Sequence, residues 1–243
     1  MIFICYGMQK SASSFAWSIV KDLTEELGHN QNLLRKTYID DKNFRVEYQN
    51  IFNIEEYEYF NERIPQNEIL VIKSHAPISA ELGEHIQSQG GCAIATYRDP
   101  LDIAISLLDV GVTERLKPIE KQRTGFASIK CLDDAVQRLP KTVEIAESWL
   151  NFDFITHIHY EQLCYNTNTA VDNIVSSFKS VGVEVPDEIV VDVLTRYSSK
   201  SNPVIPEFNV GGVGRYNERM SSTDINALKS KYSSFRNKIE SLI

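Results

Sequence analysis

The chain has 243 residues, of which 42% are hydrophobic and 24% charged, and its 25 Lys and Arg against 33 Asp and Glu give a formal net charge of −8. This composition excludes disordered, collagen-like and membrane-spanning proteins, and a chain of this length buries a core without disulfide or metal crosslinks. The negative charge argues against a nucleic-acid partner, because affinity for phosphate backbones depends on clustered Lys and Arg.

The compartment is indicated by the cysteines and by the amino-terminal segment. Four cysteines stand far apart without a CxxC pair, which suits a reducing compartment and gives no zinc signature. The apolar run at residues 1–6 lacks a basic preceding segment and is too short for a signal peptide. We therefore expect a cytoplasmic protein with no membrane partner. No motif indicates an oligomeric state.

The first predicted unit is a strand, a loop and a helix. Residues 2–6 are apolar and end at Gly7, which predicts a buried parallel strand. Apolar residues then recur at four-residue spacing over 15–27, the stripe of a helix that is buried on one face. Ser13 or Ser14 is a suitable cap for its start.

The rest of the chain alternates between strand and helix patterns. Residues 30–66 are polar and aromatic, and their aromatic side chains are expected to pack in the core or to line an acceptor pocket. Apolar runs predict strands over 69–72, 92–97 and 154–160, and periodicity predicts helices over 101–108, 132–150, 169–181, 187–197 and 222–242. The alternation predicts an α/β fold, a single P-loop-type domain over 1–243 with a central parallel sheet flanked by helices.

Polar residues gather where the predicted strands end, which is where ligands bind in such folds. They are Lys10, Ser11, Lys73, His75, Arg98 and Tyr160. The first loop is similar to a P-loop, in which helix amides and a Lys hold phosphate. Its glycine spacing does not match the Walker A motif, and Asp99, the strand-end carboxylate, reads as a helix cap. A kinase-like phosphotransferase is therefore the less favoured alternative.

Four motifs follow one another along nearly the whole chain. Residues 9–15, Gln-Lys-Ser-Ala-Ser-Ser-Phe, are similar to P-K-S-G-T-T-W, and residues 73–77 match K-[ST]-H-x-P. Residues 98–106 match R-[ND]-P-x-D-x-x-x-S at every defined position, and residues 160–163 are similar to Y-E-D-L. In this order and with these spacings the sequence resembles the sulfotransferases that use 3′-phosphoadenosine 5′-phosphosulfate (PAPS).

The resemblance implies a site and a reaction. It implies a nucleotide site made of Lys10, Ser11, Ala12, Ser13, Ser14, Phe15, Arg98, Ser106, Tyr160, Gly214 and Arg215. It further implies that His75 is the catalytic base and that Lys10 and Lys73 stabilise charge on the phosphate and sulfonate oxygens. The expected reaction moves a sulfuryl group from PAPS to a hydroxyl or amine of a small-molecule acceptor and leaves 3′-phosphoadenosine 5′-phosphate (PAP).

The sequence also departs from the family pattern. Ala12 stands where the motif has glycine, Gln9 replaces proline and Phe15 replaces the tryptophan that stacks on adenine. The family signature R-K-G-x-x-G-x-W corresponds to residues 209–216, which lack its two leading cations. The 3′-phosphate would then depend on Arg98, Ser106 and backbone amides, with Arg215. A non-catalytic nucleotide-binding protein is the third interpretation.

Two further patterns are a pair of histidines and a run of basic residues. His157 and His159 share one face of a predicted strand, but no third ligand stands nearby, so no metal site is expected. Basic residues between 115 and 130 are expected to form a solvated face, or alternatively part of a lid over the acceptor or nucleotide. No motif identifies the acceptor.

Overall fold

The computed structural model describes residues 1–39, 49, 52–198 and 212–242. At its centre lies a sheet of four parallel strands in the order β2-β1-β3-β4. The strands are β1 (Ile2–Gly7), β2 (Leu70–Ser74), β3 (Cys92–Tyr97) and β4 (Ile155–His159). Each lies within two residues of its predicted range. The α/β class with a central parallel sheet flanked by helices is therefore confirmed.

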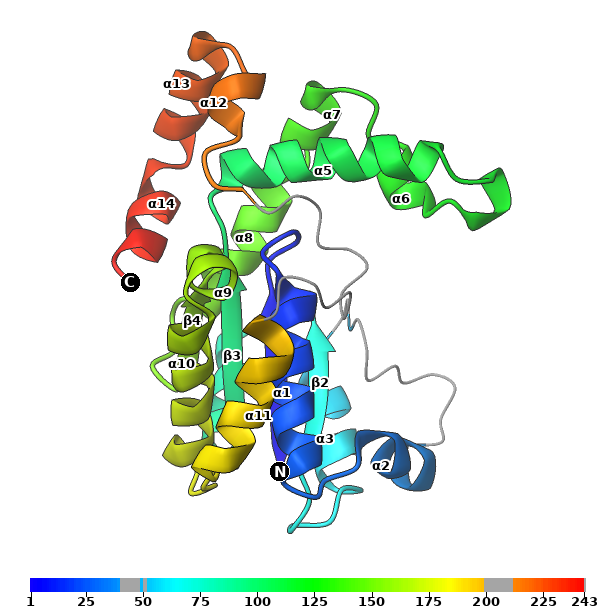
Figure 1. The fold of residues 1–243 in the computed structure, drawn as a ribbon, viewed down its shortest axis with the longest axis vertical. Coiled ribbons are helices and arrows are strands. Elements are labelled where there is room, and N and C mark those ends of the chain that lie inside the picture. Colours follow the sequence, from blue (N-terminus) through cyan, green and yellow to red (C-terminus); the bar gives the residue numbers. More distant parts are fainter. Residues whose placement is uncertain (40–48, 50–51, 199–211, 243) are drawn as a thin grey trace.

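Helices cover both faces of the sheet (Figure 1). One layer comprises α1 (Ser13–Glu26), α9 (Tyr160–Tyr165), α10 (Thr167–Ser180) and α11 (Asp187–Ser198), and the opposite layer comprises α3 (Ile54–Asn61), α4 (Ala80–Ser88) and α8 (Leu139–Trp149). The short α2 (Gln31–Tyr38) contacts α1 and β2. Side chains of β1 alternate between the two layers, as the two-residue period of a strand requires.

A third group of helices lies beyond the carboxyl ends of the strands (Figure 1). Helix α5 (Pro100–Arg115) crosses this edge, and the chain continues through η1 (Ile119–Lys121), α6 (Thr124–Ala127) and α7 (Leu132–Val136). After residue 211, α12 (Tyr216–Arg219) and α13 (Ser222–Lys231) pack against α5, and α14 (Ser233–Glu240) follows. Loops leaving the strands therefore meet α5 and the segment that begins at residue 212.

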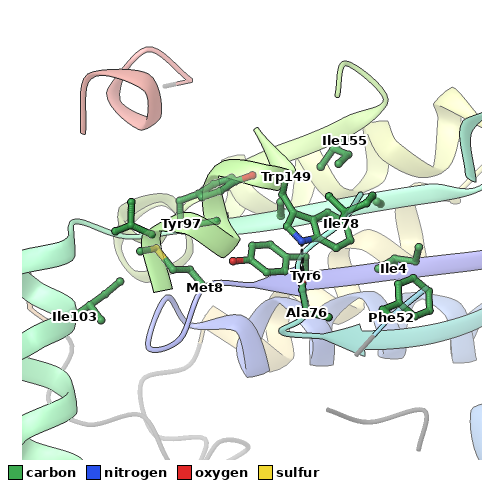
Figure 2. Close-up of a cluster of buried hydrophobic side chains, with 14 of the residues drawn as sticks. Ile4, Tyr6, Met8, Phe52, Ala76, Ile78, Tyr97, Ile103, Trp149 and Ile155 are labelled. Atoms are coloured by element: carbon green, nitrogen blue, oxygen red, sulfur yellow. Dashed lines mark hydrogen bonds between the residues drawn. The ribbon is translucent and has the colours of Figure 1, made fainter. Parts of the chain in front are cut away.

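An aromatic cluster connects one helical layer to the end of β2 (Figure 2). Tyr6 and Trp149 stack with ring centroids 4.7 Å apart, and both are almost fully buried. The Trp149 indole donates a hydrogen bond to the carbonyl oxygen of Ala76, at 2.8 Å. Because Ala76 directly follows His75, α8 fixes the backbone next to the proposed base.

Most described aromatic residues of the 30–66 region pack in the core, whereas Tyr38 is exposed. Phe52, Tyr57 and Phe60 are buried, and the rings of Phe52 and Tyr57 meet edge to face. Of the two expectations for this region, core packing holds for these three residues. Phe44 and Tyr48 lie outside the described residues.

Several helix boundaries differ from the predictions for identifiable reasons. Helix α5 runs to Arg115 instead of residue 108 because its last turns pack against the following segment, where Gly111 lies against the backbone of Ile129. The predicted helix over 132–150 is two helices, since Pro140 is tolerated only in the first turn of a helix. The predicted strand over 154–160 ends at His159, whose amide bonds to the Gln162 side chain and caps α9. Tyr232 likewise separates α13 from α14.

Six α-helices of the described residues are missing from the predictions, namely α2, α3 and α4 and the shorter α6, α9 and α12. Helices α2, α3 and α4 begin with cap residues, Asn30, Asn53 and Ser79, whose side chains accept hydrogen bonds from the first turn. Two of them have only eight residues, which is too short for a clear periodic stripe. The cap residues of these three helices are visible in the sequence, but the apolar residues that follow are too few to predict a helix from their spacing.

Candidate active site

The strand order places two loops where ligands bind in open α/β folds. After β1 the chain proceeds to β2 on one side, and after β3 it proceeds to β4 on the other side. Connections thus diverge between the neighbouring strands β1 and β3, which is the topological switch point of the sheet. Loop 8–12 follows β1 here and Arg98 follows β3.

Loop 8–12 has the backbone geometry of an anion-binding loop. Lys10 and Ala12 adopt left-handed conformations, with φ of 66° and 62°. Gly7 is required because a Cβ there would lie 1.9 Å from the Cβ of Ser13. Within the described residues no carbonyl accepts the amides of Ser13 and Ser14, the first residues of α1. A helix amino-terminus with unpaired amides and two left-handed residues before it favours a bound anion.

The Ser11 hydroxyl forms hydrogen bonds that hold loop 8–12 in place. It is fully buried and donates to the carbonyl oxygen of Met8 at 2.6 Å. Its oxygen also lies 2.7 Å from the Thr96 hydroxyl on β3, so Thr96 is the donor in that pair. The Met8 amide bonds in turn to the Thr96 carbonyl at 3.0 Å. Ser11 and Thr96 therefore tie the loop to β3.

Lys73 reaches the start of α1 from β2. Only 2% of this residue is exposed, and its ammonium donates to the Ser14 hydroxyl at 2.7 Å. The same ammonium lies 5.9 Å from the centroid of the Trp17 ring. The buried ammonium of Lys73 thus lies beside the amino-terminus of α1, where loop 8–12 ends.

His75 joins the end of β2 to the end of β1. Its Nδ1 lies 2.5 Å from the carbonyl oxygen of Gly7. A carbonyl oxygen only accepts, so Nδ1 carries the proton and Nε2 carries the lone pair. Burial lowers the pKa of His75 to about 4, the Gly7 bond opposes this shift, and the Lys73 ammonium adds to it. The imidazole is therefore neutral near pH 7, with its unprotonated nitrogen at Nε2.

Arg98 follows the end of β3 and contacts three separate parts of the chain. It is 3% exposed, and its two terminal nitrogens donate to the carbonyl oxygens of Lys10, at 3.0 Å, and Gly212, at 2.7 Å. Its guanidinium carbon lies 3.8 Å from the centroid of the Tyr160 ring. The Nε atom is buried and has no hydrogen-bond partner among the described residues. Arg98 thus connects loop 8–12 with the segment after residue 211.

Helix α5 presents one face to that segment. Asp102, Ser106 and Asp109 share this face, at the i, i+4 and i+7 positions of the helix. The buried Asp102 carboxylate accepts the amide of Gly214 at 2.8 Å. Burial raises the pKa of Asp102, although the Gly214 bond and the Arg98 charge act against it. Ser106 is 4% exposed and lies between the two carboxylates.

Arg215 points to Asp109. Its guanidinium lies 2.6 Å from the Asp109 carboxylate, which also binds Arg219 at 2.9 Å. Against the effect of burial, the bonds from Arg219 and Arg215 lower the pKa of Asp109. The structure therefore brings Lys10, Lys73, His75, Arg98 and Tyr160 together at the strand ends, while Arg215 is engaged farther along α5.

Phe15 lies on α1 where the adenine-stacking aromatic is expected. Its ring meets that of Tyr197, on α11, edge to face at a centroid distance of 5.3 Å. The Tyr197 hydroxyl donates to Asp22 at 2.9 Å, which fixes α11 against α1. An aromatic pair thus lies at the first turn of α1, directly after the loop.

The structure offers no metal cluster within the described residues. His157 instead pairs its Nδ1 with the Tyr97 hydroxyl, at 3.1 Å, and burial lowers its pKa. Nor does any helix in the described part of the chain have the length and apolar character to cross a bilayer.

Comparisons with known proteins agree with this geometry at the level of the fold. No protein-family model matches the chain, and no curated protein matches it. Among solved structures, retinol dehydratase in complex with androsterone and the inactive cofactor PAP aligns with a TM-score of 0.58 at 12% identity, over 96% of this chain and 79% of that one. Mouse sulfotransferase SULT7A1 complexed with PAP aligns with a TM-score of 0.58 at 15% identity, over 99% and 87%. The chain has the sulfotransferase fold.

Within this sulfotransferase fold, four residues that the sequence analysis did not single out support the site. Asp102 is a defined position of the second motif, so the signal existed, but its partner Gly214 is not visible from spacing. Thr96 and Tyr197 lie inside a strand and a helix whose patterns only predict packing. Asp109 follows the motif serine by less than one turn. Residues 209–211 of the carboxyl-terminal signature lie outside the described residues.

Proposed function

We propose that this protein is a PAPS-dependent sulfotransferase that transfers a sulfuryl group to a hydroxyl or amine of a small-molecule acceptor. The single observation that carries the proposal is the bond between His75 Nδ1 and the Gly7 carbonyl oxygen. It attaches a neutral imidazole to the residue from which the anion-binding loop begins. A base and a phosphate site in direct contact suit transfer of a group from a nucleotide to an acceptor.

The residues at the strand ends fit the nucleotide. The amides of Ser13 and Ser14, with Lys10, would hold the 5′-phosphosulfate. The buried Nε of Arg98 is a donor without a partner in the described chain, and Ser106 lies along the adjoining helix face, so these two would hold the 3′-phosphate. Phe15 and Tyr160 would border the adenine. Gly214 and Arg215, which bind Asp102 and Asp109 on α5, would lie beside the 3′-phosphate.

His75 would act as the general base. Its Nε2 would remove the proton of the acceptor as the acceptor oxygen or nitrogen forms its bond to sulfur. The bond between sulfur and the 5′-phosphate oxygen breaks in the same step, and its electron pair stays on that oxygen. Lys10 and the amino-terminus of α1 would stabilise this charge, and Lys73 would stabilise the sulfonate oxygens. The sulfuryl group carries less negative charge than a phosphoryl group, so the proposed step uses no metal ion.

Nucleotide selectivity gives the first test. Saturating PAP should raise the melting temperature of the protein, because a ligand that binds only the folded state stabilises it by about 2.7 kcal/mol at a hundred times its Kd. ATP with magnesium should raise the melting temperature much less. Stabilisation by ATP alone would favour the kinase-like alternative and contradict the proposal.

Sulfuryl transfer gives the second test. Labelled PAPS would be offered with a panel of alcohols and amines, including steroid and retinoid alcohols, since two structural neighbours hold androsterone or retinol. His75→Ala should lower turnover roughly 10²–10⁴-fold and leave the Kd of PAP nearly unchanged. His85→Ala, on α4, is the matched control and should keep full turnover. Near-wild-type turnover of His75→Ala would remove the base assignment. PAP binding without transfer to any acceptor would favour the non-catalytic alternative.

A further inference from the structure

The chain between Val112 and Lys130 forms a projection, which we call the arm. It comprises the end of α5, η1 and α6, and it extends away from the sheet at the edge where the strands end (Figure 1). It therefore lies on the same side of the molecule as the candidate active site.

The arm is a built structure. The carboxylate of Glu114, which is fully buried, accepts the Lys117 ammonium at 2.7 Å, the Arg123 side chain at 2.8 Å and the Arg123 amide at 2.9 Å. The Arg115 guanidinium donates to the carbonyl oxygens of Ala127 and Ile129. These bonds close the arm internally, so its outer face is held in one arrangement.

The arm exposes large apolar side chains. Val112 in the last turn of α5, Leu116 at its end and Ile119 at the start of η1 are 46%, 82% and 85% exposed. The other strongly exposed large apolar residues among those described are spread over the chain as single residues or as members of other segments. Scattered exposed residues need no explanation, whereas three large apolar side chains exposed within eight residues of a projection are typical of an interaction surface.

The arm also differs from the rest of the chain in charge. Its 19 residues contain five Lys or Arg and two Glu, which gives +3, so the remaining residues of this −8 chain carry −11. Screening limits the reach of exposed charges to about 8–10 Å at physiological salt, so a surface that touches the arm meets mainly its positive charge. The arm is therefore both apolar and basic in an otherwise acidic molecule.

We propose that the arm docks on an anionic lipid bilayer. Leu116 and Ile119 enter the interface between headgroups and acyl chains, and Lys121 and Lys130 meet the acidic headgroups. A bilayer fits better than a protein helix because the apolar residues stand on a projection and not in a groove. Contact of this kind revises the sequence-based expectation of no membrane partner. It requires no membrane-spanning helix and is independent of the proposed reaction.

Vesicle co-sedimentation tests the proposal. The full-length protein is mixed with vesicles of phosphatidylcholine alone, or of phosphatidylcholine with 30% phosphatidylglycerol, at low and physiological salt. Wild type should bind the anionic vesicles, more weakly at higher salt, and should bind the neutral vesicles poorly. The double variant Leu116→Ser/Ile119→Ser should lower the partition coefficient roughly tenfold or more, because it removes the apolar part without changing charge. Lys121→Gln/Lys130→Gln should lower it roughly fivefold per lysine.

Matched controls separate docking from folding. Leu33→Ser removes a comparably exposed leucine on α2, 61% exposed, and should leave vesicle binding unchanged. Circular dichroism melts of all variants should coincide with that of wild type, because the altered side chains are exposed. Absence of wild-type binding to anionic vesicles, or equal binding by the arm variants, would overturn the proposal. So would light scattering that shows a dimer dissolved by Leu116→Ser/Ile119→Ser with no binding to lipid, since the arm would then be a protein interface.

Discussion

Ala12 holds a backbone conformation that is unfavourable for any residue with a side chain. Its φ of 62° and ψ of 26° lie in the left-handed region, immediately before the first turn of α1. The left-handed conformation costs an L-residue with a side chain roughly 1–2 kcal/mol, whereas glycine adopts it without this cost. The alanine found in place of the motif glycine thus keeps the loop geometry but stores strain in it.

Replacing Ala12 by glycine should relieve that strain. We expect Ala12→Gly to raise the free energy of unfolding by up to about 1 kcal/mol, after allowance for the greater freedom of glycine in the unfolded chain. Urea denaturation measures the change. Ala16→Gly, in the right-handed backbone of the same helix, is the control and should lower stability by at least about 1 kcal/mol. Equal destabilisation by both changes would contradict the strain at Ala12.

The environment of His75 also leads to a prediction about pH. The folded protein takes up this proton only near pH 4, whereas an unfolded chain takes it up near pH 6.5. Between these values the unfolded state binds more protons, so stability falls as pH is lowered from 6.5 to 4. His75→Gln should remove this loss, which is about 3 kcal/mol at pH 4.

Two measurements check the pH dependence. NMR titration should show one imidazole, absent from His75→Gln, that protonates near pH 4 and carries its neutral-state proton on Nδ1. Denaturation curves at pH 7 and pH 5 should show a steeper loss for wild type than for the variant. A midpoint near 6.5 for this imidazole would show that it is not buried as described.

Side-chain identities were predictable at this scale, but their partners were not. Lys73, His75 and Arg98 follow from motifs at strand ends, and the parallel sheet brings those ends together. The acceptors of Arg98 are backbone carbonyls, one of them 114 residues away, and a backbone carbonyl leaves no mark in a sequence. The Ser11 hydroxyl points to Thr96 on β3, and the apolar run around Thr96 predicts only a buried strand, not this hydrogen bond.

Among the elements, α5 organises more of the molecule than its motif suggests. Asp99 caps its first turn, Asp102 in that turn and Asp109 in the middle bind the segment after residue 211, and its last turn begins the arm. The sequence predicted its start from the Asp-Pro pair but ended it at residue 108. Its end is set by tertiary contacts with the arm, such as Gly111 against the carbonyl of Ile129, which a single-sequence period does not contain.

Glu114 should control the order of the arm. Hydrogen bonds from Lys117 and Arg123 lower the pKa of Glu114 to about 2. Its stabilising effect is therefore fully present above about pH 4.5 and is lost as pH falls toward 2. At neutral pH Glu114→Gln should raise amide hydrogen exchange over residues 115–130 roughly tenfold or more, because the Lys117 ammonium and the side chain and amide of Arg123 lose their charged acceptor. Glu120→Gln, exposed on the same arm, should leave exchange unchanged. Unchanged exchange in Glu114→Gln would show that the arm is held by other contacts.

For the whole molecule, the two helical layers share one thin sheet. Trp149 anchors one layer and Phe178 the other, where its ring lies 4.7 Å from that of Phe3 on β1. Neighbouring residues of β1 point into opposite layers, so neither layer keeps its core without the strand they share. We therefore propose that residues 1–243 unfold as one domain.

Mutations that create a cavity in one helical layer test whether the chain unfolds as one domain. Trp149→Ala and Phe178→Ala should each lower the free energy of unfolding by about 3–5 kcal/mol. In both variants tryptophan fluorescence and far-ultraviolet circular dichroism should report one coincident transition. Loss of structure confined to the layer that carries the mutation would show two separately folding parts.

The contact between Arg98 and Gly212 also sets an order of events during protein synthesis. The two residues are 114 positions apart, so at roughly 5–20 residues per second their emergence from the ribosome differs by roughly 6–23 s. During that interval the strands and the first loop are available, but the guanidinium lacks one of its acceptors. A nascent chain thus completes the hydrogen bonds of the Arg98 guanidinium only after Gly212 has emerged, and a chain released before Gly212 leaves this cation incompletely paired.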